Sequence, residues 1–576
     1  MRRLLFLVSA VALASALPAC LRAFSISSAD GWFEDGDGLL FWLTWASDLG
    51  GRRLLLAAGL AVGLVVVTMR SNSIGALGGP LGALVDIFSK PLVVAALVAF
   101  ALLPKLMVSA QRPDSSDKPD VIFILLDTVR LDHVGWGGSE LNTTPKLDAL
   151  ARKGAAFTQG ITQAPWTKPS IATLITGQVP GSHGATARRA VLSERKRTMA
   201  EAFAAAGYRT AAFSSNPNIT PVFGFAQGFQ SYTTDTKSSA EPFLAAGDVW
   251  LEQADDQASF LYLHLNDAHY PYEPLPGYAG MFNQTGIPAH LDGDSEREFR
   301  ETEGSGFSAE EVESLRLSYA EEIRYLDDQV GDFIAKQLAA NDNLLIVICS
   351  DHGEEFMEHG DLGHAHALHE ELIRVPLQFA WSPALGERLG FKPGIHDEQV
   401  RHIDVLPTLL EAAGMDWPAS AQALQGSSLQ EFFRKENSRK SRPAFSETDS
   451  MGSPLSGPTG PLRSLRMPNR KLIVTDPWFE ASANRYWLYD LIADSGEHKN
   501  LALERPALRE KMWTQLLELG LMVERSHIPD VHVKLSTKEE ADLKEMGYAN
   551  DVEEDPFAEE PYFDPRATKW IEIKDQ

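Results

Sequence analysis

Cysteine is almost absent from this sequence. Only Cys20 and Cys349 occur among 576 residues, so a disulfide framework is excluded, and the fold is expected to need none in any cellular compartment. Cys349 stands inside the apolar run LLIVICS and is most simply a buried strand residue.

A surplus of basic residues is missing as well. The 52 Lys and Arg residues are outnumbered by 78 Asp and Glu residues, and the formal net charge is -26. Because such a chain repels a phosphate backbone, the composition argues against a nucleic-acid partner. The length exceeds that of one ordinary core and predicts a large catalytic domain with appendages.

Long apolar runs are confined to the first 110 residues. Arg2 and Arg3 precede an apolar run over 4–20, which fits either a cleaved signal or a first membrane helix. The runs over 54–69 and 91–108 are each about one bilayer crossing long. We therefore expect a membrane-anchoring region at 1–110 with about three transmembrane helices.

The charge at the start of the chain predicts its orientation. Arg2 and Arg3 hold the N-terminus inside, so an odd number of spans exports everything after Val108. The expected location is the cell (inner) membrane, with the catalytic domain periplasmic or extracellular. Lipidation at Cys20 stays an alternative, because 17–20 resembles a lipobox with an ill-fitting Pro18.

A polar linker at 111–118 precedes the part of the chain that reads as α/β. Apolar runs without alternation occur at 121–127, 260–266 and 344–351, and each ends in polar groups. This pattern indicates strands buried on both faces, hence a mostly parallel sheet flanked by helices. In such sheets the chemistry gathers at the carboxyl ends of the strands.

Two of these strands predict a metal site. Asp127 follows VIFILL directly, and Asp351 and His352 follow LLIVICS in the same way. Two carboxylates, one imidazole and one hydroxyl oxygen suit a single divalent metal, with Zn²⁺ or Mn²⁺ favoured over Ca²⁺. Thr167 is the candidate for the hydroxyl.

Thr167 lies in the stretch QAPWTKPSIATLITGQ, which reads as the start of a helix. One interpretation is that Thr167 caps this helix, with Pro169 in its first turn. The other is that Thr167 is a nucleophile facing an anionic ester, because a helix N-terminus favours an anion. Only distant partners can decide between the two.

Histidines gather in two places. The third strand ends in His264, Asp267 and His269, and the stretch EHGDLGHAHALHEEL holds a further cluster of four: His359, His364, His366 and His369. A single histidine is more often a packing or surface residue than a functional one. The clustering just after Asp351 predicts that at least one of them reaches the site.

The order of these blocks resembles a known family. DVIFILLDTVRLDHVG, PWTKPSIATLITGQVPGSHG, FLYLHLNDAHYPYEP, SDHGEEFMEHG and IDVLPTLLEAAG follow one another as in the sulfatase family of the alkaline phosphatase superfamily. The resemblance covers about 119–501. It implies an alkaline-phosphatase-like sheet, with a catalytic domain at 119–435 and a small C-terminal sheet subdomain at 436–525.

The resemblance implies roles for individual residues. Asp127, Asp351 and His352 become metal ligands, together with the nucleophile Thr167, and His269 contacts the anionic oxygens of the substrate. Either His364 or His366 falls near the position beside the leaving group, and the spacing does not choose between them. Lys168, at the helix N-terminus, is expected to bind the substrate and offset its charge.

Three departures from the family pattern bear on the chemistry. Thr167 and Ile171 replace the nucleophile and the arginine of the C/S-x-P-x-R block, and threonine cannot be oxidised to formylglycine. Thr128 replaces the second aspartate after Asp127, and His352 replaces the usual asparagine. This set resembles threonine-nucleophile relatives: lipoteichoic acid synthases, phosphoethanolamine transferases and nucleotide phosphodiesterases.

Three functions fit these residues. The first is a membrane-anchored metallohydrolase or transferase that cleaves phosphate or sulfate esters through a metal-activated Thr167. The second is a true sulfuric ester hydrolase without formylglycine, and the third is a catalytically degenerate sulfatase-like protein that binds the envelope. The expected substrate is a phosphate or sulfate ester, with an envelope polymer or a lipid headgroup as a possible source.

The last segment, 526–576, is predicted to be a short helix followed by an acidic tail. The run LSTKEEADLKEMGY over 535–548 has Ser536 or Thr537 in place to open a capping box and Gly547 to end the helix. The stretch DVEEDPFAEEPYFDP after it is acidic and proline-containing, as flexible tails are.

Overall fold

The computed structural model describes most of the chain after the predicted membrane region. The described residues are 118–253, 257–286, 307–434, 442–448, 461–475, 486–524 and 531–545. The predicted membrane-anchoring region 1–110, nearly all of the linker and the acidic tail lie outside them. Within the described ranges, no helix is both long and apolar enough to cross a bilayer.

An eight-stranded sheet forms the centre of the described part. Its strand order is β11-β2-β10-β7-β1-β6-β4-β5. The strands are β1 (Asp120–Leu126), β2 (Ala155–Ile161), β4 (Arg209–Ser214), β5 (Ser231–Thr234), β6 (Ser259–Leu265), β7 (Leu344–Ser350), β10 (Arg374–Trp381) and β11 (Gly394–Arg401). Only β10 pairs antiparallel with its neighbours β2 and β7, and the other pairs are parallel. The predicted mostly parallel sheet is therefore confirmed.

The three strands expected from the apolar runs lie side by side in the sheet. β1 pairs with β7 and with β6, so Leu126 stands level with Ser350 on one side and Leu265 on the other. Nearly every residue of the three strands is fully buried, as unalternated apolar runs require. The residues that follow these strands consequently meet at one edge of the sheet.

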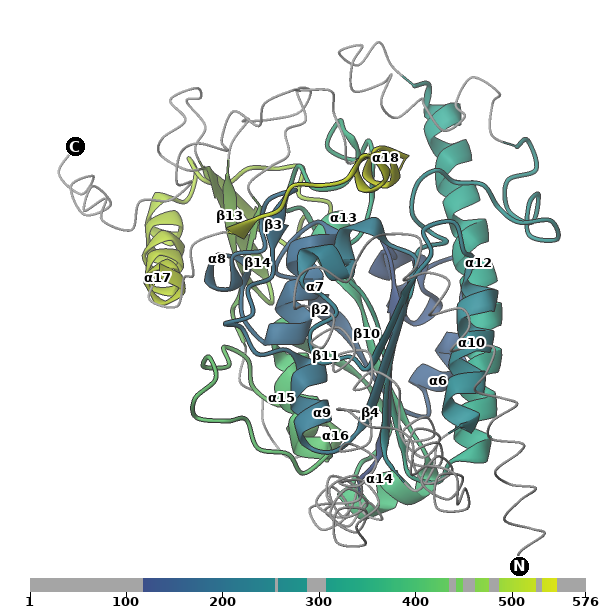
Figure 1. Ribbon diagram of the computed structural model, residues 1–576. Helices are drawn as coiled ribbons and strands as arrows, with labels where there is room; N and C mark the ends of the chain where they lie inside the picture. Colours follow the sequence, from purple (N-terminus) through teal and green to yellow (C-terminus); the bar gives the residue numbers. More distant parts are fainter. Residues whose placement is uncertain are drawn as a thin grey trace, which may run out of the picture. The chain divides into compact units, whose positions relative to one another are not determined.

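Helices cover both faces of the sheet (Figure 1). On one face lie α6 (Pro145–Ala151), α10 (Ala240–Glu252) and the long α12 (Ala309–Ala340); on the other lie α7 (Thr167–Thr176), α9 (Met199–Ala205), α15 (Val405–Ala412) and α16 (Gln430–Phe433). Alternate residues of β1 supply the two cores. Phe123 packs in the core on the α7 side, whereas Ile122 and Ile124 pack in the core on the α12 side.

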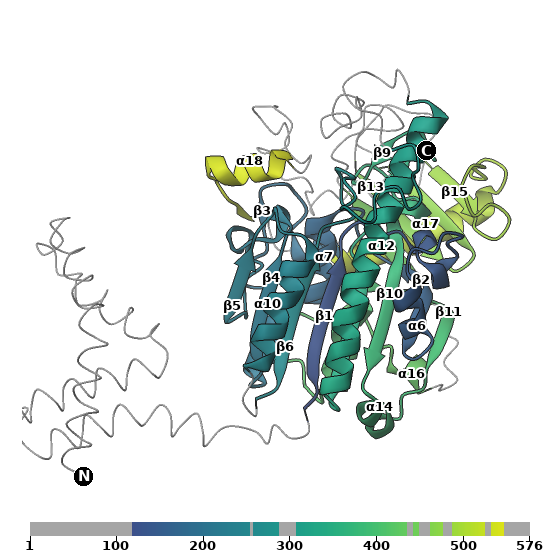
Figure 2. The same ribbon diagram turned by 90° about the vertical axis from the view of Figure 1, so that its right-hand side faces the viewer.

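A second, smaller sheet follows in the chain. It is antiparallel, in the order β12 (Ala444–Thr448), β13 (Leu462–Met467), β14 (Arg470–Thr475) and β15 (Tyr486–Asp490). The helix α17 (Pro506–Glu524) packs on it through Met512 and Leu516. Figure 2 shows β15 and α17 together beside the large sheet. The predicted small C-terminal sheet is thus present.

The remaining elements are short. They are β3 (Ala190–Val191), β8 (Glu355–Phe356), β9 (Leu362–Gly363), β16 (Val531–His532), α8 (Pro180–His183), α13 (Glu370–Ile373), α14 (Pro383–Leu389), α18 (Thr537–Glu545) and the 3-10 helices η3 (Leu131–His133), η4 (Gly135–Gly137), η5 (Pro217–Ile219), η6 (Pro221–Phe223) and η7 (His402–Asp404). The predicted capping box of α18 is confirmed at Ser536, whose hydroxyl accepts from the Glu539 N–H while Glu539 accepts from the Ser536 N–H.

Candidate active site

The ends of β1 and β7 deliver three of the predicted ligands to one place. Asp127 follows β1, Asp351 and His352 follow β7, and all three side chains are fully buried. One oxygen of Asp351, Oδ1, accepts hydrogen bonds from the N–H groups of Thr128 and His352, at 3.2 and 3.0 Å. The other oxygen, Oδ2, takes part in neither of these bonds.

Thr167 joins this group from a distant part of the sequence. α7 begins at Thr167 itself, and its cap residue is Trp166, which makes no side-chain capping bond. The interpretation of Thr167 as the helix cap is therefore wrong. The Thr167 hydroxyl oxygen instead lies 3.3 Å from Nε2 of His352, at the positive end of the α7 dipole.

Three oxygen atoms thus surround Nε2 of His352, and that of Thr167 is the first of them. Nε2 of His352 lies 3.3 Å from Oδ2 of Asp351 and 3.6 Å from Oδ1 of Asp127. Both of these carboxylate oxygens are buried, and neither has a hydrogen-bond partner among the described residues. Buried, unbonded carboxylate oxygens are costly unless a cation satisfies them. The residues fit a divalent metal ion bound by Asp127, Asp351, His352 and the Thr167 oxygen.

The second oxygen of Asp127 is held by two residues that the sequence analysis did not assign to the site. Oδ2 accepts from Nδ2 of Asn216 at 2.6 Å and lies 2.7 Å from Nε2 of His264. Donor atoms of His264, Asp127 and Asp351 also lie within 4.8 Å of one another, so His264 is a further possible ligand. Asn216 is the second residue after the end of β4, so a strand-end rule that includes the two residues after each strand could have found it.

The electrostatics of the two carboxylates differ. Burial raises the pKa of Asp127, but its hydrogen bond to His264 and the charge of that ring outweigh burial and lower it. Burial and the nearby charge of Asp127 raise the pKa of Asp351 well above its usual range. Burial lowers the pKa of His352, which favours the neutral imidazole that binds metals.

Thr128, which stands where the family pattern has a second aspartate, has a structural role. Its backbone has φ of 59°, a left-handed conformation that is rare for a β-branched residue. The Thr128 hydroxyl lies 2.8 Å from the Asp127 carbonyl and 2.9 Å from the Ala268 carbonyl, and the Tyr319 hydroxyl donates to the Thr128 carbonyl. The side chain is used to hold the loop.

The histidine cluster separates into two groups. The His364 ring lies 4.4 Å from that of His352 and 5.0 Å from that of His269, between ring centroids. Nδ1 of His364 is 2.9 Å from Glu354, whereas Nε2 of His366 is 2.8 Å from Glu355. The structure thus places His364 and His269 beside the donor atoms, and His366 against a different carboxylate.

Lys168 is buried next to Thr167 but has other partners. Its amino group donates to the Arg188 carbonyl and lies 3.4 Å from the centroid of the Phe223 ring. Burial, with a smaller effect from the charge of Arg188, lowers the pKa of Lys168 well below its usual range. Its contact with substrate stays a prediction.

Comparison with known proteins gives one consistent picture. The sulfatase family model matches residues 119–415. An ulvan-active sulfatase of Formosa agariphila is 25% identical over 390 residues, covering 61% of this chain and 72% of its own. A Δ4,5-hexuronate-2-O-sulfatase of Bacteroides thetaiotaomicron is 24% identical over 428 residues, covering 67% of this chain and 85% of its own.

The fold is also shared with a solved hydrolase. The phosphonate monoester hydrolase of Agrobacterium radiobacter superposes with a TM-score of 0.57 at 21% identity, over 73% of this chain and 99% of its own. The resemblance stated from the sequence motifs therefore agrees with the match of the family model and with the architecture.

Proposed function

The chain belongs to the sulfatase family of the alkaline phosphatase superfamily, and we propose that it is a metal-dependent ester hydrolase with Thr167 as its nucleophile. One observation carries the proposal. The Thr167 hydroxyl lies beside Nε2 of His352 in a fully buried place. Two carboxylate oxygens near the same nitrogen have no hydrogen-bond partner among the described residues. Such a set of donors binds a cation and presents an oxygen to it.

Asp127, Asp351 and His352 would hold the ion. When bound, a divalent ion of the Zn²⁺ or Mn²⁺ kind would lower the pKa of the Thr167 hydroxyl and polarise the ester. Attack by the Thr167 oxygen forms a bond to the phosphorus or sulfur atom and releases the alcohol. Water then hydrolyses the threonine ester, or an acceptor alcohol receives the group.

Two histidines are placed to act on the substrate. Glu354 orients His364 through its Nδ1 contact, and a protonated His364 could give its proton to the leaving oxygen. Nδ1 of His269 lies 2.7 Å from the Tyr270 carbonyl, which fixes the second ring. His269 and the N-terminus of α7 would stabilise the charge that develops on the oxygens under attack.

The substrate class has two candidates. Sulfate esters come first, because the matched relatives act by name on ulvan and on a hexuronate 2-O-sulfate. Phosphate or phosphonate esters come second, because Thr167 cannot become formylglycine and because the fold is shared with a phosphonate monoester hydrolase. In both cases the polar site suits an ester with an anionic head.

We test the proposal with the purified chain loaded with Zn²⁺ or Mn²⁺. It is offered a panel of aryl sulfates, aryl phosphate monoesters and aryl phosphate diesters, and turnover is compared before and after chelation. Metal-dependent cleavage of at least one class is expected. A metal-loaded chain that cleaves none of them would favour the degenerate, envelope-binding interpretation.

The place of action belongs to the same proposal. The apolar runs of 1–110 support a membrane anchor, and the paired arginines at the start support export of the catalytic domain. An exported domain would meet sulfated or phosphorylated envelope polymers and lipid headgroups.

A further inference from the structure

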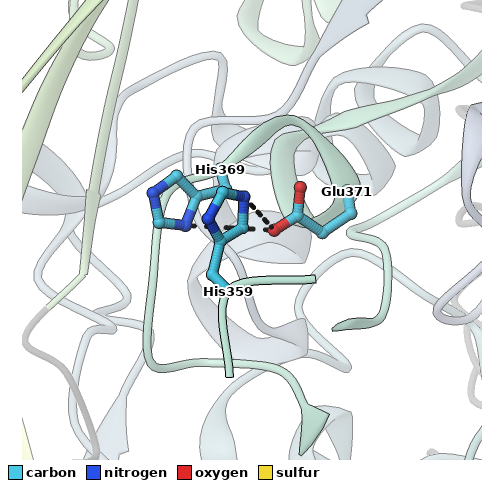
Figure 3. Close-up of side chains that lie close together, drawn as sticks. All are labelled: His359, His369 and Glu371. Atoms are coloured by element: carbon cyan, nitrogen blue, oxygen red, sulfur yellow. Dashed lines mark ion pairs between the residues drawn. The ribbon is translucent and has the colours of Figure 1, made fainter. Parts of the chain in front are cut away.

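Part of the histidine cluster has no place in the active site. His359 follows β8, His369 precedes α13 and Glu371 lies within α13, and their side chains come together in Figure 3. The two imidazoles stack with their centroids 3.6 Å apart and their planes at 16°. Both rings face the carboxylate of Glu371 from the same side (Figure 3).

The facing atoms of this group lack ordinary partners. Oε1 of Glu371 lies 3.3 Å from Nε2 of His359 and 3.9 Å from Nδ1 of His369. All three atoms are buried and have no hydrogen-bond partner among the described residues. Each of the three residues offers an atom that can bind a metal, and these atoms lie within 4.8 Å of one another.

The ligand set suits zinc. Tetrahedral Zn²⁺ with ordinary bond lengths holds its ligand atoms roughly 3.3 Å apart, which matches the His359–Glu371 distance of 3.3 Å, whereas the His369–Glu371 distance of 3.9 Å must shorten. Two imidazole nitrogens and one carboxylate oxygen are also a ligand set that zinc uses, whereas Ca²⁺ and Mg²⁺ prefer oxygen alone. Because the lone pair of an imidazole nitrogen lies in the ring plane, the two stacked rings must turn out of their stack before both nitrogens point at one ion.

The electrostatics agree with this geometry. Burial, and for His369 the neighbouring ring of His359, lower the pKa of both histidines and favour the neutral form that binds metals. Burial and the charge of Glu355 raise the pKa of Glu371 well above its usual range. A bound cation would stabilise the ionised carboxylate of Glu371.

We propose that His359, His369 and Glu371 bind a second divalent cation, Zn²⁺ by preference, whose role is structural. The side chains of the three residues are 14, 17 and 7% exposed, so the site lies close to the surface. Because the three facing atoms themselves are buried, water could complete the coordination only once the side chains turn toward the ion. The exposed His498 has its ring centroid 5.7 Å from that of His359 and is the alternative fourth ligand.

The position of the group explains what a metal would stabilise. Glu370, between two of the ligands, forms an ion pair with Arg466 of the small sheet at 2.7 Å. On the other side, the Gly353 N–H donates to the Leu372 carbonyl at 2.9 Å, one residue after His352. An ion here would therefore link the segment after β7, which carries His352, to the residues that contact the small sheet.

The full-length chain tests this inference through its metal content. After loading with Zn²⁺ and dialysis against a competing chelator, we expect two bound equivalents in the parent and about one in Asp351→Asn, whose weakened active site loses its ion to the chelator. Glu371→Gln should also fall to about one, and the double variant to about none. His396→Ala is the matched control, because that ring is similarly buried and also has a carboxylate neighbour.

Thermal unfolding supplies the second measurement. Added Zn²⁺ should raise the Tm of Asp351→Asn but not that of the double variant. If Glu371→Gln does not fold, a measurement on Asp351→Asn takes its place. The visible absorption of Co²⁺ bound to Asp351→Asn should then indicate nitrogen and oxygen ligands. The inference is overturned if Asp351→Asn binds no metal, which would leave an ordinary histidine–carboxylate ion pair. Loss of activity in the ester panel alone would bear on Thr167 and not on this site.

Discussion

The Thr167 hydroxyl lies 3.3 Å from Nε2 of His352, although 185 positions separate the two residues in the chain. The contact exists because β7 ends and α7 begins at the same edge of the large sheet. It places a hydroxyl against an imidazole whose neighbours are two carboxylates with unbonded oxygens.

Asp351→Asn should lower metal affinity and turnover together. The substitution removes one charge from the ligand set while keeping the shape of the side chain. We expect metal binding to weaken by about tenfold or more, measured by titration with a competing chelator. Asp327→Asn is the control, because Asp327 is equally buried but accepts from the Lys146 and Leu147 N–H groups on the α12 side of the sheet.

Asn216→Ala should weaken metal binding without changing a ligand. The amide donates at 2.6 Å to the Asp127 oxygen that faces away from the metal, and so orients the carboxylate. Loss of such a supporting contact typically costs about 10 to 100-fold in metal affinity. Asn218→Ala removes an equally buried amide two residues on. Equal metal affinity in the parent and Asn216→Ala would contradict the orienting role.

Much of this site could be predicted from strand ends. Apolar runs without alternation identified the strands β1, β6 and β7, and the rule that parallel strands carry their chemistry at one edge brought Asp127 and Asp351 together. The small C-terminal sheet followed from the family resemblance. These features are local in sequence or repeated throughout a fold class.

Other features depend on tertiary contacts that no local pattern contains. The spacing of His364 and His366 is the same as that of any i, i+2 pair, and only the positions of Glu354 and Glu355 separate their roles. The cap interpretation of Thr167 failed because helix-start signals locate the first turn to within a residue or two, and α7 begins one residue before the expected position.

Acid should destabilise the protein partly through His183. This buried ring accepts from the Ala185 N–H at Nδ1 and lies 3.2 Å from the Pro169 carbonyl at Nε2, which requires the neutral form. Burial, with a smaller effect from the charge of Lys196, lowers its pKa from 6.5 to about 3. The unfolded chain therefore binds the extra proton, so this stability is complete above pH 6.5 and is lost as the pH falls toward about 3.

The contribution of His183 can be measured by comparing the parent with His183→Gln. Between neutral pH and about pH 4.5, the free energy of unfolding of the parent should fall by about 2 to 3 kcal/mol more than that of His183→Gln. The comparison uses chemical denaturation with metal held in excess. Parallel pH profiles in the two proteins would show that His183 is protonated in the folded state as readily as in the unfolded one.

A reporter fused after Lys118 should lie outside the cytoplasm. Paired arginines at the start of the chain and an odd number of spans before Gln111 predict export. Alkaline phosphatase placed there should be active and green fluorescent protein dark. The opposite pattern would indicate an even number of spans and a cytoplasmic substrate.

Turnover by the metal-loaded Thr167→Ala protein tests the central claim most directly. Because Thr167 is not the cap residue of α7, the variant should fold with nearly the parent Tm and still bind metal through Asp127, Asp351 and His352. We predict that its turnover of the best ester substrate falls by at least about 10³-fold, while Thr167→Ser keeps measurable activity. Turnover equal to that of the parent in the folded, metal-bound Thr167→Ala protein would contradict the assignment of Thr167 as the nucleophile.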